Sequence, residues 1–212
     1  MKYADISSSP VREPVQTRSR EKKLRIVQCA REMINEEGYD TITTNTIARR
    51  AGVSIGTLYS YFRNKKDVLM EVVAAFNDDI YTHFQSGIRE NTEDAQTLEE
   101  TIDAVLLALW HAHIHEQRLH NEIVILSLRD PQVDEAFSAN EERLFKKIRE
   151  LMIRFNDRID VGNPTAAMFV LKYAVDGVIN RLLECENRMD IEAVLREMSV
   201  MVLKYLAKTP RS

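Results

Sequence analysis

The residues of this sequence that come nearest to a catalytic or metal-binding pattern are histidines between positions 111 and 120. In the segment His115-Glu116-Gln117-Arg118-Leu119-His120, two histidines flank a glutamate, as in helical zinc sites where the histidines lie four residues apart. Here the second histidine comes one residue later and is rotated by roughly 140° about a helix axis. His111 and His115 are four residues apart and would share a face. A metal ion bound there is therefore an alternative to ordinary polar or core histidines.

Other catalytic patterns are missing from the sequence. It contains no glycine-rich phosphate loop, no nucleophile elbow and no paired carboxylates at a spacing suited to acid and base catalysis. We therefore predict that the chain is not an enzyme, needs no cofactor and has no dedicated metal site.

Charge is distributed unevenly along the chain. The net charge is −4, yet residues 1–66 contain 13 Lys and Arg against 7 Asp and Glu, whereas residues 67–212 contain 16 against 26. A basic N-terminal region followed by an acidic remainder indicates that only the first part meets a polyanion such as nucleic acid.

Two short helices are expected within this basic region. The segment from Thr43 to Gly52 offers a hydroxyl N-cap, about two turns of helix and a closing glycine, and Ser54 can cap a second helix over residues 55–62. Ala51-Gly52-Val53 supplies the turn between them. Two short helices joined in this way, with a longer helix on either side, predict a helix-turn-helix.

The flanking sequence defines the extent of this domain. Apolar residues at helical spacing predict a helix over residues 18–37, and Gly38 stands where a terminating glycine is expected. The preceding segment is rich in Ser and Pro and has no periodicity. We therefore expect a flexible arm at 1–16, a DNA-binding domain at 17–66, and a ligand-binding and dimerisation domain at 67–212.

The sequence from Thr43 to Leu69, TTNTIARRAGVSIGTLYSYFRNKKDVL, resembles the DNA-binding signature of TetR-type (tetracycline-repressor-like) regulators. The resemblance includes the AGVS turn, the GTLY start of the recognition helix and the YF-x-x-K end, and it extends over 27 contiguous residues. Beyond it, the likeness is only in the predicted helical layout.

The resemblance implies which residues contact DNA, and elementary physics supports part of it. Ser54 begins a helix whose N-terminal amides attract phosphate. Gly56 would allow close approach of the backbone to DNA, or is merely a small residue tolerated near a helix start. The residues that the resemblance implies hold phosphates are Thr44, Thr57, Ser60, Tyr61 and Lys65. Those implied at base-reading positions are Asn45, Ile55, Gly56 and Tyr59.

The remaining sequence predicts further helices and no strand, so the fold class is all-α with about nine helices. Their expected positions are about 65–90, 98–114, 116–128, 131–155, from 164 onward, and 190–206. Apolar and aromatic residues on the middle helices mostly belong to a core, but pockets between helices are lined in the same way. A pocket is implied by the resemblance. Its candidate ligand-binding residues are Phe84, Trp110, His113, Met152, Tyr173 and Asp176.

The last two predicted helices each have two apolar sides, which need two partners. One partner can be the chain's own body, and the other the same helices of a second copy, giving a two-fold four-helix bundle. The predicted dimer-interface residues are Met168, Leu171, Val175, Val178, Leu182, Val194, Met198, Met201 and Tyr205. A second apolar side is formed by Phe169, Val170, Leu195 and Val202.

These features predict a repressor that binds a palindromic double-stranded DNA operator as a homodimer and is released by a small, largely apolar effector. An activator or ligand-independent regulator of the same fold, and a helical interaction protein that retains a helix-turn-helix, are the alternatives. The longest apolar run, Ala104 to Trp110, is too short to cross a bilayer. Cys29 and Cys185 have no Cys-x-x-Cys spacing, which favours free thiols. We expect no membrane partner and a cytoplasmic location.

Overall fold

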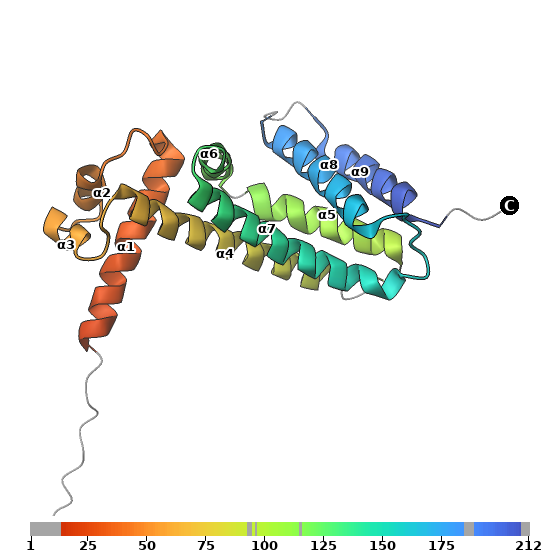
Figure 1. Ribbon diagram of the computed structural model, residues 1–212, viewed down its shortest axis with the longest axis horizontal. Helices are drawn as coiled ribbons and strands as arrows, with labels where there is room; N and C mark the ends of the chain where they lie inside the picture. The colour runs from red at the N-terminus through yellow and green to blue at the C-terminus, as the bar shows by residue number, and fades with distance from the viewer. Residues whose placement is uncertain (1–13, 93–94, 96, 115, 185–188, 209–212) are drawn as a thin grey trace, which may run out of the picture. The chain divides into compact units, whose positions relative to one another are not determined.

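The computed structural model describes residues 14–92, 95, 97–114, 116–184 and 189–208 (Figure 1). Within these residues the chain forms nine α-helices and one short 3₁₀ turn, with no strand. The all-α fold class predicted from the sequence is confirmed.

The chain divides into two compact units, residues 1–72 and 73–212. We call the first unit the head and the second the body. The chain passes from one to the other within helix α4 (Lys65–Thr92). The change of unit comes a few residues after the position where the sequence places the domain boundary.

The head contains α1 (Pro14–Glu37), α2 (Thr44–Arg50), α3 (Ile55–Tyr59) and the start of α4. Helix α1 starts within the segment expected to be a flexible arm, because proline suits the first position of a helix, where no amide donor is needed. The rest of that arm lies outside the described residues. The core of the head is apolar and comes from every one of its helices. It includes Ile26, Ile34, Ile47, Leu58, Phe62 and Leu69.

Helix α3 ends at Tyr59, earlier than the expected end at Phe62. The reason is the geometry of its last turn, where the amides of both Tyr61 and Phe62 donate to the carbonyl of Leu58 at 3.0 Å. The chain tightens there and directs Phe62 into the core of the head, where it is buried.

The body consists of the rest of α4 and five further helices. These are α5 (Leu98–Ile114), α6 (Gln117–Ser127), α7 (Pro131–Met152), α8 (Pro164–Glu184) and α9 (Ile191–Leu206), with a 3₁₀ turn at Ile153–Phe155. The expected helix over 131–155 therefore ends at Met152 and tightens into the 3₁₀ turn. Asp130 caps α7 by accepting the amide of Gln132, and Pro131 occupies its first position.

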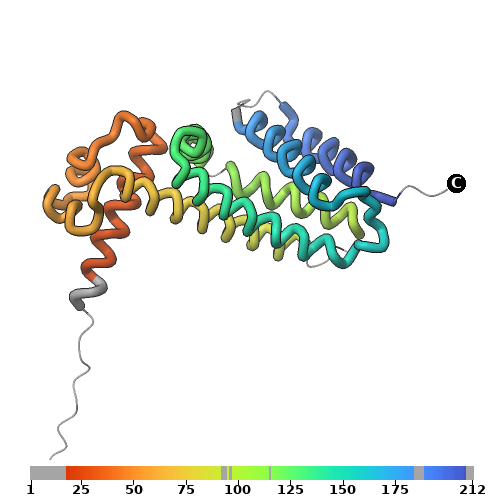
Figure 2. The backbone as a smooth tube through the Cα atoms, in the orientation of Figure 1, coloured from red at the N-terminus to blue at the C-terminus, as the bar shows by residue number. Residues whose placement is uncertain are grey.

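Helix α5 is central in the body. Most of its side chains are buried, and it contacts α6, α7, α8 and α9 (Figure 2). It also passes close to α4, since a Cβ atom added at Gly87 would lie 3.0 Å from the Cβ of Ala108. Helices α8 and α9 lie side by side and pack on α5 (Figure 1). The body is thus a helical bundle around α5.

Candidate nucleic-acid interface and buried cavity

The turn between α2 and α3 is held by local bonds that its residue types predict. Thr43 and Thr46 form a capping box, in which each side chain accepts the other's backbone amide. Gly52 has a φ of 62°, which favours glycine, and the amide of Val53 donates to the carbonyl of Ala48 at 3.0 Å. The helix-turn-helix geometry is therefore fixed by the sequence of the turn itself.

Helix α3 turns one side inward and the other to solvent. Leu58 is fully buried, whereas Ile55, Gly56 and Tyr59 are exposed. A Cβ added at Gly56 would meet only the hydroxyl of Ser54, at 4.0 Å, so no neighbour within the chain requires glycine at this position. The exposed side is the one that the resemblance implies reads bases.

The Ser54 hydroxyl caps α3 by accepting the amide of Thr57 at 3.1 Å, and the two hydroxyl groups lie 2.8 Å apart. At the other end of the helix, the Ser60 hydroxyl donates to the carbonyl of Thr57 at 2.6 Å. These predicted contact residues thus have local bonds that shape α3. Asn45 on α2 is exposed, like Ser54 and Ser60.

Tyr59 connects the two short helices. Its hydroxyl lies 3.1 Å from the hydroxyl of Thr44, at the start of α2, and 52% of the residue is exposed. A tyrosine held on the surface by a bond at its far end presents an ordered aromatic edge. Tyr59 is not part of the buried core of the head.

Tyr61 and Lys65 have roles inside the head that the sequence did not indicate. The Tyr61 hydroxyl lies 3.0 Å from that of Ser19 on α1. The Lys65 ammonium donates to the carbonyls of Tyr39 and Ile42, both at 3.0 Å, and lies 4.1 Å from the centre of the Tyr39 ring. Lys65 was predicted as a phosphate contact. In the structure it connects α4 to the loop after α1 through these two hydrogen bonds.

Among the basic residues of the head, some pair with carboxylates and others project into solvent. Arg50 forms a two-bond pair with Glu36, both at 2.7 Å, and Arg63 pairs with Asp67 at 2.9 Å. These hydrogen bonds raise the pKa of both guanidinium groups and lower the pKa of both carboxyl groups. A second group projects from the exposed surface of α1. It consists of Arg18, Arg20, Lys22 and Arg25.

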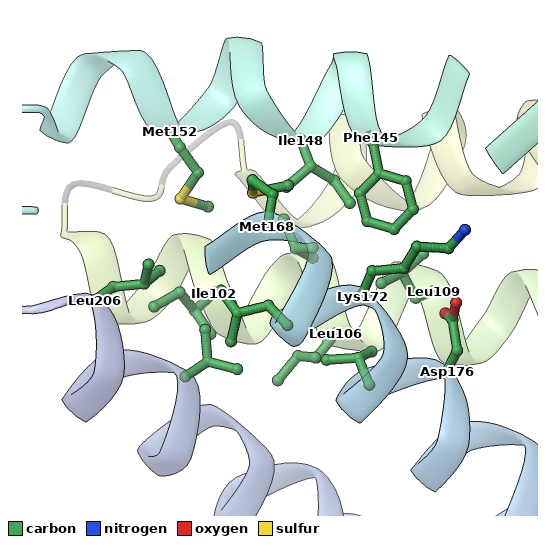
Figure 3. Close-up of a pocket in the computed structure, with 14 residues that line it drawn as sticks. Ile102, Leu106, Leu109, Phe145, Ile148, Met152, Met168, Lys172, Asp176 and Leu206 are labelled. Carbon is green, nitrogen blue, oxygen red and sulfur yellow. The ribbon is translucent and has the colours of Figure 1, made fainter. Parts of the chain in front are cut away.

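The body contains two cavities that share part of their lining. The smaller, of about 70 Å³, is almost wholly apolar and lies between α5, α7, α8 and α9 (Figure 3). The larger, of about 290 Å³, extends toward α4 and α6. The residues common to both are Leu109, Phe145, Ile148 and Asp176.

The larger cavity has polar side chains among its aromatic ones. The Nδ1 of His113 lies 2.6 Å from the carbonyl of Leu109, and the Nε2 of His120 lies 3.1 Å from the Oδ1 of Asn180. Each of these nitrogens must donate, because its partner is an acceptor only. The second ring nitrogen of each histidine is therefore an acceptor. The Nδ1 of His120 and the Oδ1 of Asn140 are buried with no hydrogen-bond partner among the described residues.

Burial determines the protonation of this cluster. It lowers the pKa of His113, and it lowers the pKa of His120 to about 4, with the neighbouring His113 adding to the effect. Burial and the charge of Glu141 together raise the pKa of Asp176 to about 6, against the opposing effect of Lys172. At neutral pH both histidines are uncharged and most of the Asp176 carboxyl is ionised.

Lys172 and Glu141 form an ion pair beside Asp176. The Lys172 ammonium also lies 4.9 Å from the ring centre of Tyr173 and 5.5 Å from that of Phe145. Figure 3 places Lys172 and Asp176 together at one end of the smaller cavity, with Met152 near the other.

The structure places four of the six predicted ligand-binding residues at the cavities: Met152 in the smaller, His113 and Tyr173 in the larger, and Asp176 in both. Phe84 and Trp110 line neither of these two cavities. Phe84 is fully buried as a core residue, and Trp110 is half-buried. Sequence reasoning missed five polar lining residues, whose only signal is a polar side chain in an apolar helical pattern. They are His120, Asn140, Glu141, Lys172 and Asn180.

The predicted dimer stripe on α8 requires correction. Val175 is buried and, with Met168 and Leu171, lines the smaller cavity, while Val178 and Leu182 are half-buried. This side of α8 faces into its own body, where it lines the cavity that α8 shares with α5, α7 and α9. The large apolar residues exposed on α8 are instead Phe169, Val170 and Tyr173.

On α9 the predicted stripe is divided between the core and the surface. Met198 is 4% exposed and belongs to the core, and Val194 is half-buried. Met201 and Tyr205 are exposed, by 42% and 45%. They give α9 an apolar surface that its own chain leaves uncovered.

The metal alternative involves His115, which lies outside the described residues. Across the part of the chain that is described, no group of three or more His, Cys, Asp or Glu is arranged to hold a metal ion. Over the same residues, no helix has the length and apolar character needed to cross a membrane. Cys29 is half-buried with a free thiol whose pKa is raised by burial, and Cys185 lies outside the described residues.

Comparison with known proteins supports the assignment of the head. Residues 26–72 match the family model for bacterial regulatory proteins of the tetR family. HTH-type transcriptional regulators of Staphylococcus aureus, among them those of strains USA300 and NCTC 8325, are 30% identical over 88 residues. That alignment covers 42% of this chain and 48% of each relative, so the chain spans about half the length of the curated relatives it matches.

Solved structures share the fold over most of the chain. A proposed TetR-family transcriptional regulator from Mesorhizobium loti has a TM-score of 0.73 at 23% identity, covering 90% of this chain and 99% of its own. A fatty acid degradation regulator from Bacillus halodurans has a TM-score of 0.66 at 20% identity, covering 86% and 94%. A proposed transcriptional regulator from Saccharomonospora viridis, in complex with choline, has a TM-score of 0.68 at 16% identity, covering 90% and 100%.

The fold and the head define an all-helical protein with a helix-turn-helix domain. The head matches the DNA-binding domain of bacterial regulatory proteins of the tetR family, the family that the sequence resembles.

Proposed function

We propose that this chain is a transcriptional repressor that binds a palindromic operator as a homodimer and is released from it by a small, largely apolar molecule. The observation that carries the proposal is the exposed side of α3, where Ile55, Gly56 and Tyr59 face solvent behind a capped helix start. A short exposed helix of this kind fits the major groove, where base edges are read.

Electrostatics supports contact with DNA through the head. The exposed cations of α1 come from the same unit as α3, whereas the sequence after residue 66 is acidic. Phosphate contacts provide affinity and register, and base contacts provide sequence preference. We propose Arg18, Arg20 and Lys22 as additional phosphate-contacting residues, beside the predicted Thr44, Thr57 and Ser60.

The exposed apolar surfaces of α8 and α9 support a homodimer. These two helices lie side by side, and Phe169, Tyr173, Met201 and Tyr205 are exposed on them. Pairing the two helices with their symmetry mates would cover these side chains. Two heads joined in this way would recognise half-sites separated by about one turn of DNA, roughly 34 to 36 Å.

The cavities of the body support an effector. A ligand bound there would favour one conformation of the dimer, and release from DNA follows if the two heads then no longer match successive major grooves. Fold relatives include a regulator of fatty acid degradation and one in complex with choline. Both names are consistent with small, partly apolar effectors. A regulator that acts in this way would work in the cytoplasm and would not be an enzyme.

The proposal is tested by selecting bound duplexes from a random DNA library with the purified chain, and then screening metabolites for release of the selected duplex. We expect a palindromic consensus and release by at least one small molecule. A chain that enriches no sequence is not a site-specific regulator. A consensus with no releasing molecule would favour a ligand-independent regulator, and reporter expression with and without the chain separates repression from activation.

The dimer is tested by light scattering on a matched pair of variants. Phe169 and Ile153 are 63% and 62% exposed, but only Phe169 lies on the proposed interface. Phe169→Glu should shift the chain toward monomer, while Ile153→Glu should leave a dimer. A wild-type monomer at micromolar concentration, or equal behaviour of the two variants, would contradict the interface.

A further inference from the structure

We propose that the effector held in the larger cavity is an organic cation with N–H donors, a protonated primary or secondary amine on an apolar body. The inference rests on the proposed function, because it specifies the chemical class of the molecule that the body senses. It is drawn from the polar side chains of the cavity, which have acceptor atoms without donors.

Two buried side chains lining the cavity have acceptor atoms with no partner. The Nδ1 of His120 and the Oδ1 of Asn140 have no hydrogen-bond partner among the described residues, and the two residues are 4% and 6% exposed. The remaining ring nitrogen of His113, which lines the same cavity, is also an acceptor, because its Nδ1 donates to the carbonyl of Leu109. An unpaired acceptor in an apolar site is costly, and a ligand that donates hydrogen bonds removes that cost.

The formal charge of the lining side chains also favours a cationic ligand. Lys172 forms an ion pair with Glu141 and also lies beside Asp176, so one ammonium faces two carboxylates and the three side chains have a net formal charge of −1. A positive ligand would balance that charge, whereas a carboxylate or phosphate ligand would be repelled by it.

Aromatic rings complete the environment for a cation. Phe76 and Phe137 line the larger cavity, and ring faces attract ammonium groups. The rings of Phe145 and Tyr173 also line it but already lie beside the Lys172 ammonium. The ring of His120 lies 6.0 Å from those of both Phe76 and Phe137, so its unpartnered nitrogen is framed by aromatic side chains. A hydrocarbon ligand would match these rings but would leave the acceptors unpaired and the negative charge unbalanced.

The volume limits the size of the ligand. At about 290 Å³ the larger cavity holds roughly ten water-sized groups, taking ~30 Å³ for each. An alkylamine that bears an aromatic ring, with about ten non-hydrogen atoms, therefore fits it. The smaller apolar cavity, which shares Asp176 with the larger one, offers room for an apolar extension of the ligand.

The experiment compares probes of nearly equal shape on the full-length chain by calorimetry at pH 7.5. The probes are 2-phenylethylamine, 2-phenylethanol and 3-phenylpropanoate, with tryptamine and octylamine as further primary amines. We expect at least one amine to bind, and 2-phenylethylamine to bind about tenfold or more tightly than the alcohol and the carboxylate. The inference is overturned if the alcohol or the carboxylate binds as tightly as the amine, or if none of the amines binds.

A matched pair of variants assigns the preference to the cavity. Asp176→Asn should reduce the ratio of amine to alcohol affinity by about tenfold, since it removes the counter-ion but keeps the shape. Asp157→Asn, at an exposed position after α7, should leave the ratio unchanged. An unchanged ratio in Asp176→Asn would also overturn the inference.

Failure of this inference is distinguishable from failure of the proposed function. Release of the selected duplex by a neutral or anionic metabolite, without binding of the amines, would leave the regulator intact and exclude the cationic class. Loss of all duplex selection would instead remove the regulator, whereas calorimetry with the amines would still report on the cavity.

Discussion

The head and the body differ in where the polar groups proposed to bind their partners lie. In the head, Asn45, Ser54 and Tyr59 are exposed on two short helices, and the bonds of Ser54 and Tyr59 are made within the helix-turn-helix. In the body, His120 and Asn140 are buried between helices and have unpartnered acceptors.

The difference reflects the size of the proposed partners. A DNA duplex is too large to enclose, so the head has to present a shaped and charged surface to it. A small molecule gains most of its affinity from burial, and the body contains a cavity between helices with a few polar groups that could select a ligand. The first arrangement leaves contact residues in water, and the second leaves buried acceptor atoms with no hydrogen-bond partner among the described residues.

The largest effect on stability is expected from replacing Lys65. This residue departs from the contrast, because its charged group is bonded inside the head instead of facing solvent. Its ammonium donates to two backbone carbonyls of the loop after α1. Lys65→Met should destabilise the head by about 2 to 4 kcal/mol, because hydrogen bonds from charged groups contribute about 1.5 to 3 kcal/mol each and solvent replaces part of the loss. Thermal unfolding followed by circular dichroism measures the change.

Lys22→Met is the matched control, since Lys22 is an exposed cation of the same unit. This variant should leave the melting temperature nearly unchanged. It should weaken DNA binding and make the affinity less dependent on salt concentration. If Lys65→Met also melts like the wild type, the carbonyl contacts contribute nothing to stability and only the predicted phosphate contact of Lys65 is left.

The next largest effect on stability is expected from removing the charge of Asp176 in the body. Burial raises the pKa of Asp176 to about 6. The pKa of the Asp176 carboxyl is higher in the folded chain than in the unfolded chain. The contribution of this group to stability is therefore fully present below about pH 4, and it is lost as the pH rises through 6. Asp176→Asn should therefore stabilise the chain by about 1 to 3 kcal/mol at pH 7.5, and the gain should fade toward pH 4.

Urea unfolding at several pH values measures this difference. The exposed Asp157→Asn variant serves as its control and should show no pH-dependent gain. A gain in Asp176→Asn that is constant from pH 4 to pH 8 would mean that the carboxyl is not desolvated, and the contrast with the head would weaken.

A comparable effect, on specificity rather than stability, is expected at Tyr59. Tyr59→Ala should reduce discrimination between selected and random duplexes by about 1 to 3 kcal/mol while leaving the salt dependence of binding nearly unchanged. Tyr59→Phe removes only the hydroxyl that meets Thr44 and should have a smaller effect. Affinities for both duplexes at several salt concentrations give the result, and a variant that melts normally with full preference would exclude base reading by Tyr59.

The smallest effect is expected at Gly56. Alanine meets no neighbour there, so Gly56→Ala should raise the stability of the head by up to about 1 kcal/mol. Its methyl group should nevertheless weaken binding to the selected duplex, if the backbone approaches DNA closely at this position. A variant that is more stable and binds DNA equally well would show that glycine is merely tolerated.

Prediction from the sequence succeeded where the determinants are local. The capped turn at Thr43 and Ser54 and the glycine at 52 lie within a dozen residues, so the helix-turn-helix can be read directly, and the fold class follows from periodicity. The sequence could not indicate that Lys65 contacts carbonyls near residue 40, because that contact depends on how the loop after α1 folds.

The cavity was predicted less completely for the same reason. His120, Asn140 and Asn180 come from three different helices, and only packing brings them together. The exposed side of α8 was also misassigned, since Val175 and Phe169 both belong to apolar stripes. Only the packing of α8 within the body decides which stripe is covered.

The most direct test of the account is the affinity of the wild-type chain for its selected duplex and for a scrambled duplex between 50 and 200 mM salt. The account predicts that the selected duplex binds more tightly at every salt concentration. It also predicts that affinity for both falls steeply with salt, by about a thousandfold or more if the dimer contacts at least six phosphates. Equal affinity for the two duplexes, or affinity independent of salt, would contradict the claim that the head reads DNA.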